Sequence, residues 1–484
     1  MRSDRLFDDI DVSSDMSEVR RQVGFVAAVQ VVRLVLYAAT NAVLPFLIPP
    51  AAFGLLVLVS VPVAVATLFG DFGIGESIVR TKKLTRELAS LLFWIALGLA
   101  LLSAGFIVGT VPLFEAWYET DGLLGISIAF SVLVLLRVLG NQYRALLRRQ
   151  LRLRSMNKIE LVTSISSNSA TLSLAFLGVG VVSLPIGMAF GAAVDLLGCM
   201  IATAWIPGRP APLSSGRAAL RFGAGLGLSG AIHVCGIALA NLLLGRYMAE
   251  DQLGLFDRAQ ALTRGVIERI QSIGGRVIYP LLARRHSGEG ETESVGRPLF
   301  NAALATWTPA VLLVAVVIGP IVEHLYGPGW GDLGRMIAWL VAGFALWLPG
   351  LVLTQAILAH GRTRWLLAVN ALQLVVRTGA AVTAILLEGM LPFAIFLAAL
   401  SFGLEVWKVV WIPSMIRWKI RTGRSNAVRT GVVASLPALM FVLPTALGLP
   451  HAVGILAGIV CLALIVWSWV RSPRSAEVRS LLAS

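Results

Sequence analysis

The chain has 484 residues, of which 57% are hydrophobic and only 14% are charged, and its mean hydropathy is +0.82. This composition excludes an ordinary soluble domain and is typical of a helical protein that crosses a membrane many times. The net charge of +14 fits the excess of Lys and Arg that membrane proteins carry in cytoplasmic loops, so it does not indicate nucleic-acid binding. The three cysteines lie in apolar stretches, and their odd number indicates neither a disulfide framework nor a metal site.

The order of polar and apolar stretches predicts an all-α integral membrane protein. Residues 1–21 are polar and acidic, which predicts a cytoplasmic tail without a cleavable signal peptide. Apolar runs then predict fourteen transmembrane helices, at about 22–47, 53–80, 88–111, 123–147, 158–180, 183–206, 222–247, 255–283, 299–322, 332–358, 363–387, 390–413, 428–447 and 450–470.

The basic residues predict the orientation of these helices. Most of the 40 Lys and Arg residues lie in the two tails and in every second loop. This bias predicts a multi-pass membrane protein with both termini in the cytoplasm. The connections on the other side are short, which argues against a large external catalytic domain.

A weak internal repeat relates the two halves of the chain. Asn241 and Gly254 follow Asn41 and Gly54 at the same offset. Six predicted helices separate the copies, so both copies run in the same direction, and this predicts two lobes related by an axis along the membrane normal. The predicted domains are the tail 1–21, an N-lobe 22–212, a C-lobe 213–425, accessory helices 426–471 and the tail 472–484.

One predicted helix is unusually rich in charge. The stretch 255–285, LFDRAQALTRGVIERIQSIGGRVIYPLLARR, has the length of a membrane span yet carries several Arg and acidic residues. A charge at the centre of a bilayer costs about 3 kcal/mol or more, so such residues normally face protein or water. At about 100° per residue, Arg258 and Arg269 lie within about 20° of each other, and Arg264 and Glu268 share a second stripe. The pattern predicts a helix with one side toward a wet and anionic environment.

Two motifs resemble a known family. The second predicted helix ends in TLFGDFGIGESIVR (67–80), and the eighth contains Gly254-Leu-Phe-Asp-Arg-Ala and Val277-Ile-Tyr-Pro-Leu. These motifs are similar to those of the polysaccharide transporter, or O-antigen flippase, family in the multidrug/oligosaccharidyl-lipid/polysaccharide (MOP) exporter superfamily. The family usually has Tyr where this chain has Phe256, which provides no hydroxyl group at this position.

The resemblance implies a function and a fold. The fold would be MATE-like, with two pseudo-symmetric six-helix lobes and two C-terminal helices. The protein would flip a polyprenyl-diphosphate-linked oligosaccharide across the inner membrane during polysaccharide biosynthesis, by alternating access through a central cationic cavity. Independently, the charged eighth helix favours an anionic cargo, because several arginines hold a diphosphate well. Contact with polysaccharide polymerase or export machinery is a further expectation.

Four arginines are the candidates for binding the diphosphate or glycan. Arg33, near the middle of the first predicted helix, either faces this cavity or pairs with a carboxylate such as Glu268. Arg264 and Glu268 either form an i, i+4 ion pair or a gate that opens when phosphate displaces the carboxylate. Arg258 either contacts cargo or extends toward the membrane surface. Arg269, about halfway along its helix, is the strongest candidate.

Several other charged residues are candidates for secondary roles. Asp71, Glu76 and Glu268 are candidates for H⁺ or Na⁺ coupling or for gating, because protonation or ion binding removes the cost of burying a carboxylate. The alternatives for Asp71 and Glu76 are pairing with an arginine or capping a broken helix. Arg377 is a reserve candidate for cargo binding. We expect no catalytic residues, cofactor or metal, because the five histidines have no metal-ligand spacing.

Three alternative functions remain at this stage. A peptidoglycan-precursor flippase would share these features. A small-molecule or drug antiporter of the same superfamily would favour an acidic or aromatic cavity over an arginine-rich helix. A membrane glycosyltransferase or glycan polymerase, the enzymatic alternative, would be expected to show a longer external loop or a catalytic carboxylate loop, and neither is visible.

Overall fold

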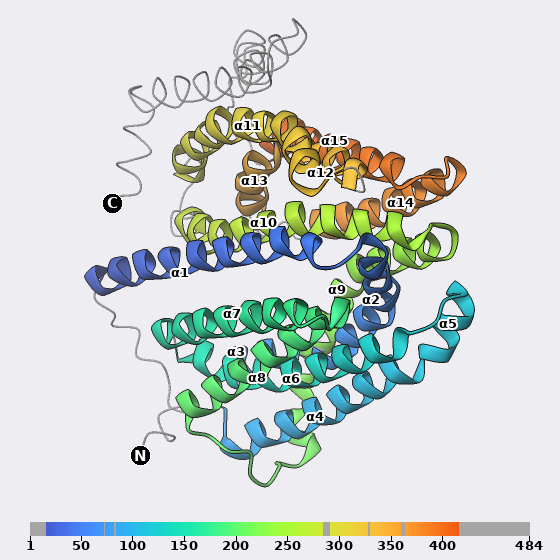
Figure 1. Cartoon of the computed structure of the whole chain (residues 1–484). Helices are drawn as coiled ribbons and strands as arrows, with labels where there is room; N and C mark the ends of the chain where they lie inside the picture. Colours follow the sequence, from blue (N-terminus) through green and yellow to red (C-terminus); the bar gives the residue numbers. More distant parts are fainter. Residues whose placement is uncertain are drawn as a thin grey trace, which may run out of the picture. The chain divides into compact units, whose positions relative to one another are not determined.

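The computed structural model describes residues 16–71, 73–81, 84–150, 152–283, 291–327, 330–359 and 364–415. These residues form α-helices and two short 3-10 helices, and no strand is found among them (Figure 1). The helices are α1 (Met16–Val43), η2 (Leu44–Phe46), α2 (Pro50–Asp71), α3 (Ile74–Arg80), α4 (Arg86–Gly109), α5 (Val111–Tyr118), α6 (Leu123–Arg149), α7 (Leu153–Phe176), η3 (Gly180–Val182), α8 (Ser183–Thr203), α9 (Leu213–Tyr247), α10 (Glu250–Ala283), α11 (Glu291–Tyr326), α12 (Gly331–Gly343), α13 (Trp347–Ala359), α14 (Arg364–Leu386) and α15 (Met390–Met415).

The all-helical fold is confirmed, while the count of fourteen spans is not. Helices occupy the first twelve predicted spans, and the predicted spans 428–447 and 450–470 lie outside the described residues. Among the described residues, seven helices are long and apolar enough to cross a membrane, or eight if the bent pair α12–α13 is one span. Helix α10 is not one of these helices, because its charged residues interrupt the apolar sequence.

The chain divides into two compact units. Unit 1 contains Met1–Asp257 and Asn370–Ile385, and unit 2 contains Arg258–Val369 and Leu386–Ser484. In unit 1, α6 packs against α4, α8, α2 and α3, and α7 packs against α8 and α1. Apolar side chains of α4 and α6 form the main core of this unit, so α6 is its central helix.

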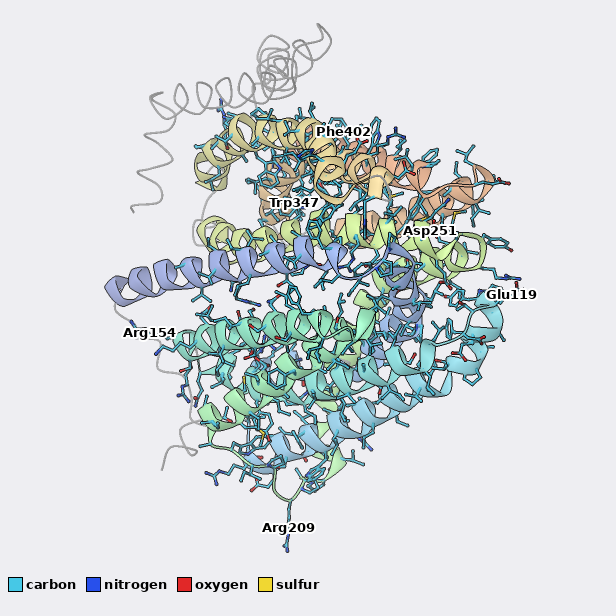
Figure 2. The ribbon with its side chains drawn as sticks, in the orientation of Figure 1. Glu119, Arg154, Arg209, Asp251, Trp347 and Phe402 are labelled. Carbon is cyan, nitrogen blue, oxygen red and sulfur yellow. The ribbon has the colours of Figure 1, made fainter. Side chains whose placement is uncertain are left out.

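The two ends of unit 1 differ in charge. Glu119, directly after α5, and Asp251, in the first turn of α10, lie at one end, while Arg154 lies at the opposite end (Figure 2). At the acidic end, Arg246 pairs with Glu119 at 2.6 Å. The hydroxyl of Thr120 donates to Glu250 at 2.5 Å.

The second predicted span is a broken helix. Helix α2 ends at Asp71, Gly73 has a left-handed φ of 67°, and α3 begins at Ile74. A residue without a Cβ adopts this φ at little cost, which explains the glycine. The buried Arg149 of α6 donates to the Ile78 carbonyl at 3.4 Å, as well as to the carbonyls of Val79 and Thr81. These contacts satisfy exposed carbonyls at the C-terminus of α3.

The internal repeat relates Gly54 on α2 to Gly254 on α10. Each of these glycines lies against the helix that carries the other. A Cβ on Gly254 would lie 1.7 Å from the Pro50 carbonyl oxygen and 3.0 Å from the Gly54 nitrogen. A Cβ on Gly54 would lie 2.2 Å from the Glu250 carbonyl oxygen. The N-terminal turns of α2 and α10 can therefore cross only because both residues lack side chains.

Unit 2 contains a second interrupted helix. The helix axis bends by 41° between α12 and α13. Within this bend, the Trp307 indole donates to the Phe344 carbonyl at 3.0 Å and the Thr308 hydroxyl donates to the Ala345 carbonyl at 3.0 Å. Side chains of α11 thus replace backbone hydrogen bonds that the bend removes, as required away from water.

Candidate functional site

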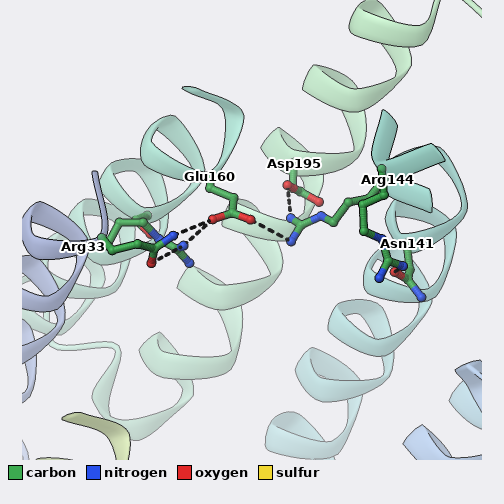
Figure 3. A network of polar contacts seen from close by, with 8 residues as sticks. Arg33, Asn141, Arg144, Glu160 and Asp195 are labelled. Carbon is green, nitrogen blue, oxygen red and sulfur yellow. Dashed lines mark hydrogen bonds and ion pairs between the residues drawn. The ribbon is translucent and has the colours of Figure 1, made fainter. Parts of the chain in front are cut away.

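A polar network connects four helices of unit 1 (Figure 3). Arg33 on α1 binds Glu160 on α7 at 2.5 Å and donates to the Ser164 hydroxyl at 2.9 Å. Gln30, one turn earlier on α1, accepts from Arg33 and donates to Glu160, both at 3.2 Å. Arg33 is thus fixed by one charged and two neutral partners, while 26% of its side chain remains exposed.

Arg144 on α6 extends this network to a second carboxylate. It lies 3.7 Å from the other oxygen of Glu160 and forms an ion pair with Asp195 on α8. The side chains of Glu160 and Asp195 are only 9% and 12% exposed, whereas that of Arg144 is 32% exposed. Ionised carboxylates in such surroundings need charged partners, which the arginines provide.

Small residues bring the helices of this network close together. A Cβ on Gly187 or Gly191 of α8 would lie within 3 Å of Thr171 or Ser167 of α7. A Cβ on Gly140 of α6 would lie 3.3 Å from the Asp195 carboxylate. Close helix approach through glycine and serine is a common feature of membrane proteins. Here it positions carboxylates of α7 and α8 beside the arginine of α6.

A second ion pair holds the half-helix α3 against α6. Arg148 binds Glu76 at 2.5 Å and the Asn141 side-chain oxygen at 3.4 Å. A Cβ on Gly75 would lie 2.7 Å from the Asn141 side chain, so a glycine is needed for α3 to approach here. Glu76 is 46% exposed, so this ion pair faces water more than the Arg33–Glu160 pair does.

The predicted residues of unit 1 have different surroundings. Arg33 pairs with Glu160, and Glu76 pairs with Arg148. Asp71 is the last residue of α2, and its side chain lies outside the described part of the chain. Arg377 is a partly buried residue of α14. The pairing alternative for Glu76 is therefore present in the structure, and its proposed role in ion coupling remains a prediction.

The predicted residues of α10 lie in unit 2. Arg258 is buried, with 4% exposure, and Arg264 is partly buried. Glu268 and Arg269 lie on the same helix, but their side chains are outside the described part of the chain. The predicted grouping of these arginines with Arg33 around one cavity remains a prediction.

Sequence reasoning missed Glu160 and Arg144. Arg144 lies near the end of the predicted span 123–147, but α6 continues to Arg149, so Arg144 lies more than one turn inside the helix. Glu160 falls in a predicted span and is a charged residue there, which was the available signal for its importance. Asp195 is likewise a charged residue within a predicted span, 183–206, and it pairs with Arg144.

The arrangement of charges suits the binding of an anion. Partly exposed guanidinium groups, held in place by buried carboxylates, offer planar donor sets that match phosphate oxygens. No group of three or more His, Cys, Asp or Glu residues that could hold a metal ion occurs within the described ranges. In this part of unit 1, arginines are the groups available for binding a charged ligand.

Comparison with known proteins identifies the family. A family model described as "Polysaccharide biosynthesis protein" matches residues 43–334, more than half of the chain. Lipopolysaccharide biosynthesis protein WzxC of Escherichia coli (strain K12) is 24% identical over 283 residues, which cover 58% of each chain. Teichuronic acid biosynthesis protein TuaB of Bacillus subtilis (strain 168) is 22% identical over 222 residues, 44% of this chain and 45% of TuaB. The chain thus spans about half the length of these curated relatives.

Solved structures share the fold. The lipid II flippase MurJ, in an inward closed conformation, has a TM-score of 0.74 at 10% identity and covers 92% of this chain and 99% of its own. A multidrug resistance MATE transporter of the MOP superfamily, in an inward-facing conformation, has a TM-score of 0.62 at 16% identity, with 81% and 96% coverage. These likenesses show the fold and confirm the predicted MATE-like architecture. The chain is a multi-pass membrane protein that belongs to the polysaccharide biosynthesis protein family and has the fold of the MOP superfamily.

Proposed function

We propose that this protein flips a polyprenyl-diphosphate-linked oligosaccharide from the cytoplasmic to the outer leaflet of the inner membrane. The observation that carries the proposal is the family match over residues 43–334, because two relatives are named for the biosynthesis of lipopolysaccharide and teichuronic acid. Such polymers are built from saccharide units that must cross a membrane. A flippase in a MOP-type fold supplies this step.

Arginines are the proposed ligands of the diphosphate. Arg33 supports this part of the proposal, because it lies within a membrane helix, is held by Glu160, and keeps 26% of its side chain exposed. We assign Arg258, Arg264 and Arg269 of α10 to the same cargo. Guanidinium groups bind phosphate oxygens in a bidentate manner, and such charge-assisted bonds are stronger in a site of low dielectric than in bulk water.

The proposed mechanism is alternating access. Two lobes, 22–212 and 213–425, would rock to expose a central cationic cavity first to the cytoplasm and then to the outside. The saccharide and diphosphate would cross in this cavity, while the polyprenyl tail stays in the bilayer. Asp71, Glu76 and Glu268 are the proposed sites for ion coupling or gating. Contact with polymerase or export machinery is a further part of the proposal.

The charge distribution supports the proposed orientation. In unit 1, Glu119 and Asp251 lie at one end and Arg154 at the other (Figure 2). Positively charged ends of membrane helices face the cytoplasm. We therefore place Arg154 and both chain termini on the cytoplasmic side.

A lipid-linked peptidoglycan precursor is the second candidate cargo. The lipid II flippase shares the fold over 92% of this chain, and the diphosphate chemistry would be the same. Because a fold does not identify a cargo, lipid II belongs in the transport test as a separate substrate. A drug antiporter of the MOP superfamily is the third candidate, and it would not require a diphosphate.

The first test changes Arg269, at the middle of α10. Sealed vesicles containing wild type, Arg269→Ala or Arg269→Lys receive a polyprenyl-diphosphate-linked oligosaccharide, and its transfer between leaflets is timed. We expect transport by the wild type, at least a tenfold lower rate for Arg269→Ala, which loses a charge-assisted contact of about 1.5–3 kcal/mol, and partial retention for Arg269→Lys.

The matched control is Arg209→Ala. Arg209 is exposed on the loop after α8 and points away from the helices (Figure 2), so its loss should leave the rate unchanged. Equal rates for wild type and Arg269→Ala would remove Arg269 from the mechanism. If the wild type moves no lipid-linked saccharide and instead moves a cationic drug, the antiporter is the correct function.

A further inference from the structure

A row of polar residues runs along one side of α6 in unit 1. Arg137, Asn141, Arg144 and Arg148 follow one another at spacings of four, three and four residues, which places them within about 60° around the helix. We call these four residues the arginine stripe. From Arg137 to Arg148 the stripe extends about 16 Å along the axis, roughly half the thickness of the hydrocarbon core.

The stripe does not face lipid. The exposed apolar residues of α6 are Leu124, Ile128 and Val132, and they lie on the side of the helix roughly opposite to the stripe. Arg137 is exposed although it lies in the middle of a helix that qualifies as a membrane span. An exposed arginine at this depth is tolerated when it faces water within the protein.

Arg137 differs from the other arginines of this part of unit 1. Arg33, Arg144 and Arg148 each form an ion pair with a carboxylate. Arg137 forms no ion pair with any residue of the described ranges, although Asp195 attracts it and Arg144 repels it at longer range. Its side chain is exposed, and no carboxylate of the described residues forms an ion pair with it.

The local charge balance favours an anion at this place. Arg33 and Arg144 pair with two buried carboxylates, Glu160 and Asp195, while Arg137 is attracted by Asp195 without an ion pair. The five groups together carry one excess positive charge. Asn141 lies one turn from Arg137 on the same side, and its side-chain oxygen accepts from Arg148 at 3.4 Å. A phosphate-bearing group would offset the excess charge and bind the planar guanidinium of Arg137.

We propose that the arginine stripe binds the phosphate groups of the cargo, with Arg137 as the first contact and Asn141 and Arg144 as the next positions along α6. The inference rests on the proposed flippase function and adds unit 1 residues that were not predicted from the sequence. Arg144 and Arg148 already bind carboxylates, so a passing phosphate competes with these partners at each step. This competition keeps the phosphate of the cargo bound weakly enough at each arginine to be released to the next, as transport along a series of sites requires.

The test of this inference uses inorganic pyrophosphate as a soluble probe. We compare the apparent melting temperature of the full-length protein in detergent, with and without pyrophosphate, for wild type, Arg137→Gln and Arg137→Lys. A ligand that binds the folded state raises the melting temperature. We expect a rise for wild type, loss of this rise for Arg137→Gln and a partial rise for Arg137→Lys.

Two controls separate binding from folding. Because Arg137 has no ion-pair partner among the described residues, Arg137→Gln should melt at the wild-type temperature without pyrophosphate. Arg209→Gln, on the exposed loop after α8, should respond to pyrophosphate as the wild type does. An equal pyrophosphate effect in wild type and Arg137→Gln, or no effect in wild type, would overturn the proposal.

A second experiment, in vesicles, tests whether the bound phosphate belongs to the cargo or to a membrane lipid. Arg137→Gln should lower the initial rate of transfer of the diphosphate-linked oligosaccharide about tenfold, in vesicles with or without phosphatidylglycerol. If instead phosphatidylglycerol alone reproduces the Arg137-dependent stabilisation and transport is unchanged, the site binds bulk lipid and the assignment to cargo is overturned. If the wild type transports no lipid-linked saccharide while the pyrophosphate effect still requires Arg137, the flippase function fails and the anion site stands.

Discussion

Arg144 contacts both buried carboxylates of the polar network in unit 1, Glu160 and Asp195. It pairs with Asp195 on α8 and with Glu160 on α7, and among the described residues Asp195 has no other ion-pair partner. Glu160 differs, because Arg33 also binds it. The loss of Arg144 would therefore affect Asp195 more than Glu160.

Removal of the Arg144 guanidinium should destabilise the protein, and a second substitution, at Asp195, should restore part of the lost stability. Arg144→Gln leaves the nearly buried carboxylate of Asp195 without a cation. This should lower the free energy of unfolding by about 3 kcal/mol. The double variant Arg144→Gln/Asp195→Asn removes this charge and should recover a large part of the loss. Thermal unfolding in detergent measures both, with the exposed Arg154→Gln as the control. Equal destabilisation of the single and double variants would show that the pair is not the cause.

Individual residues show what a sequence can predict about this site. That Arg33 and Glu76 are held in polar surroundings follows from the cost of a charge within a membrane helix. Their partners, Glu160 and Arg148, lie 127 and 72 residues away, and pairing over such distances depends on which helices pack together. The packing itself depends on glycine and serine contacts between α6, α7 and α8, which one sequence does not assign to particular neighbours.

At the level of elements, the crossing of α2 and α10 is a strong constraint. Gly54 and Gly254 each lie against the backbone of the other helix. By contrast, a Cβ on Gly105 of α4 would meet no atom within 4 Å. The same substitution should therefore have opposite effects at these positions.

Gly254→Ala should destabilise the protein and Gly105→Ala should not. The added methyl group at residue 254 would overlap the Pro50 carbonyl, and overpacking of this kind costs typically about 1–3 kcal/mol. At residue 105, alanine should stabilise the helix by up to about 1 kcal/mol, because it favours the helical conformation more than glycine does. Melting temperatures in detergent test both changes. A Gly254→Ala protein as stable as wild type would mean that α2 and α10 do not cross as closely as described.

The breaks within helices were predicted unevenly. A broken helix capped by Asp71 or Glu76 was one alternative for the second span, and the helix does break at Gly73. The bend between α12 and α13 was not predicted, and the span 332–358 was expected to be continuous. This bend depends on the side chains of Trp307 and Thr308 from α11, and no local sequence signal reveals such donors.

At the level of the whole molecule, composition and family resemblance predicted the fold class well. Apolar runs located the first twelve predicted spans in helices, because a helix that crosses a bilayer must be long and mostly apolar. By the same rule α7 and α10 are not among the described helices that are long and apolar enough to cross a membrane, because polar residues lower their mean hydropathy. The family match over residues 43–334 supports a role in polysaccharide biosynthesis, while the cargo follows from charge chemistry and remains a proposal.

The measurement that tests the central claim most directly is the choice of cargo by the wild-type protein. Sealed vesicles receive, in parallel, the same oligosaccharide on a polyprenyl diphosphate, on a polyprenyl monophosphate and on a neutral lipid, with lipid II as a fourth substrate. If arginines bind the diphosphate, the first oligosaccharide should cross at least tenfold faster than the monophosphate and neutral forms, and external pyrophosphate should inhibit it. Equal rates on all three carriers would contradict the account, and faster transfer of lipid II would assign the protein to peptidoglycan precursors.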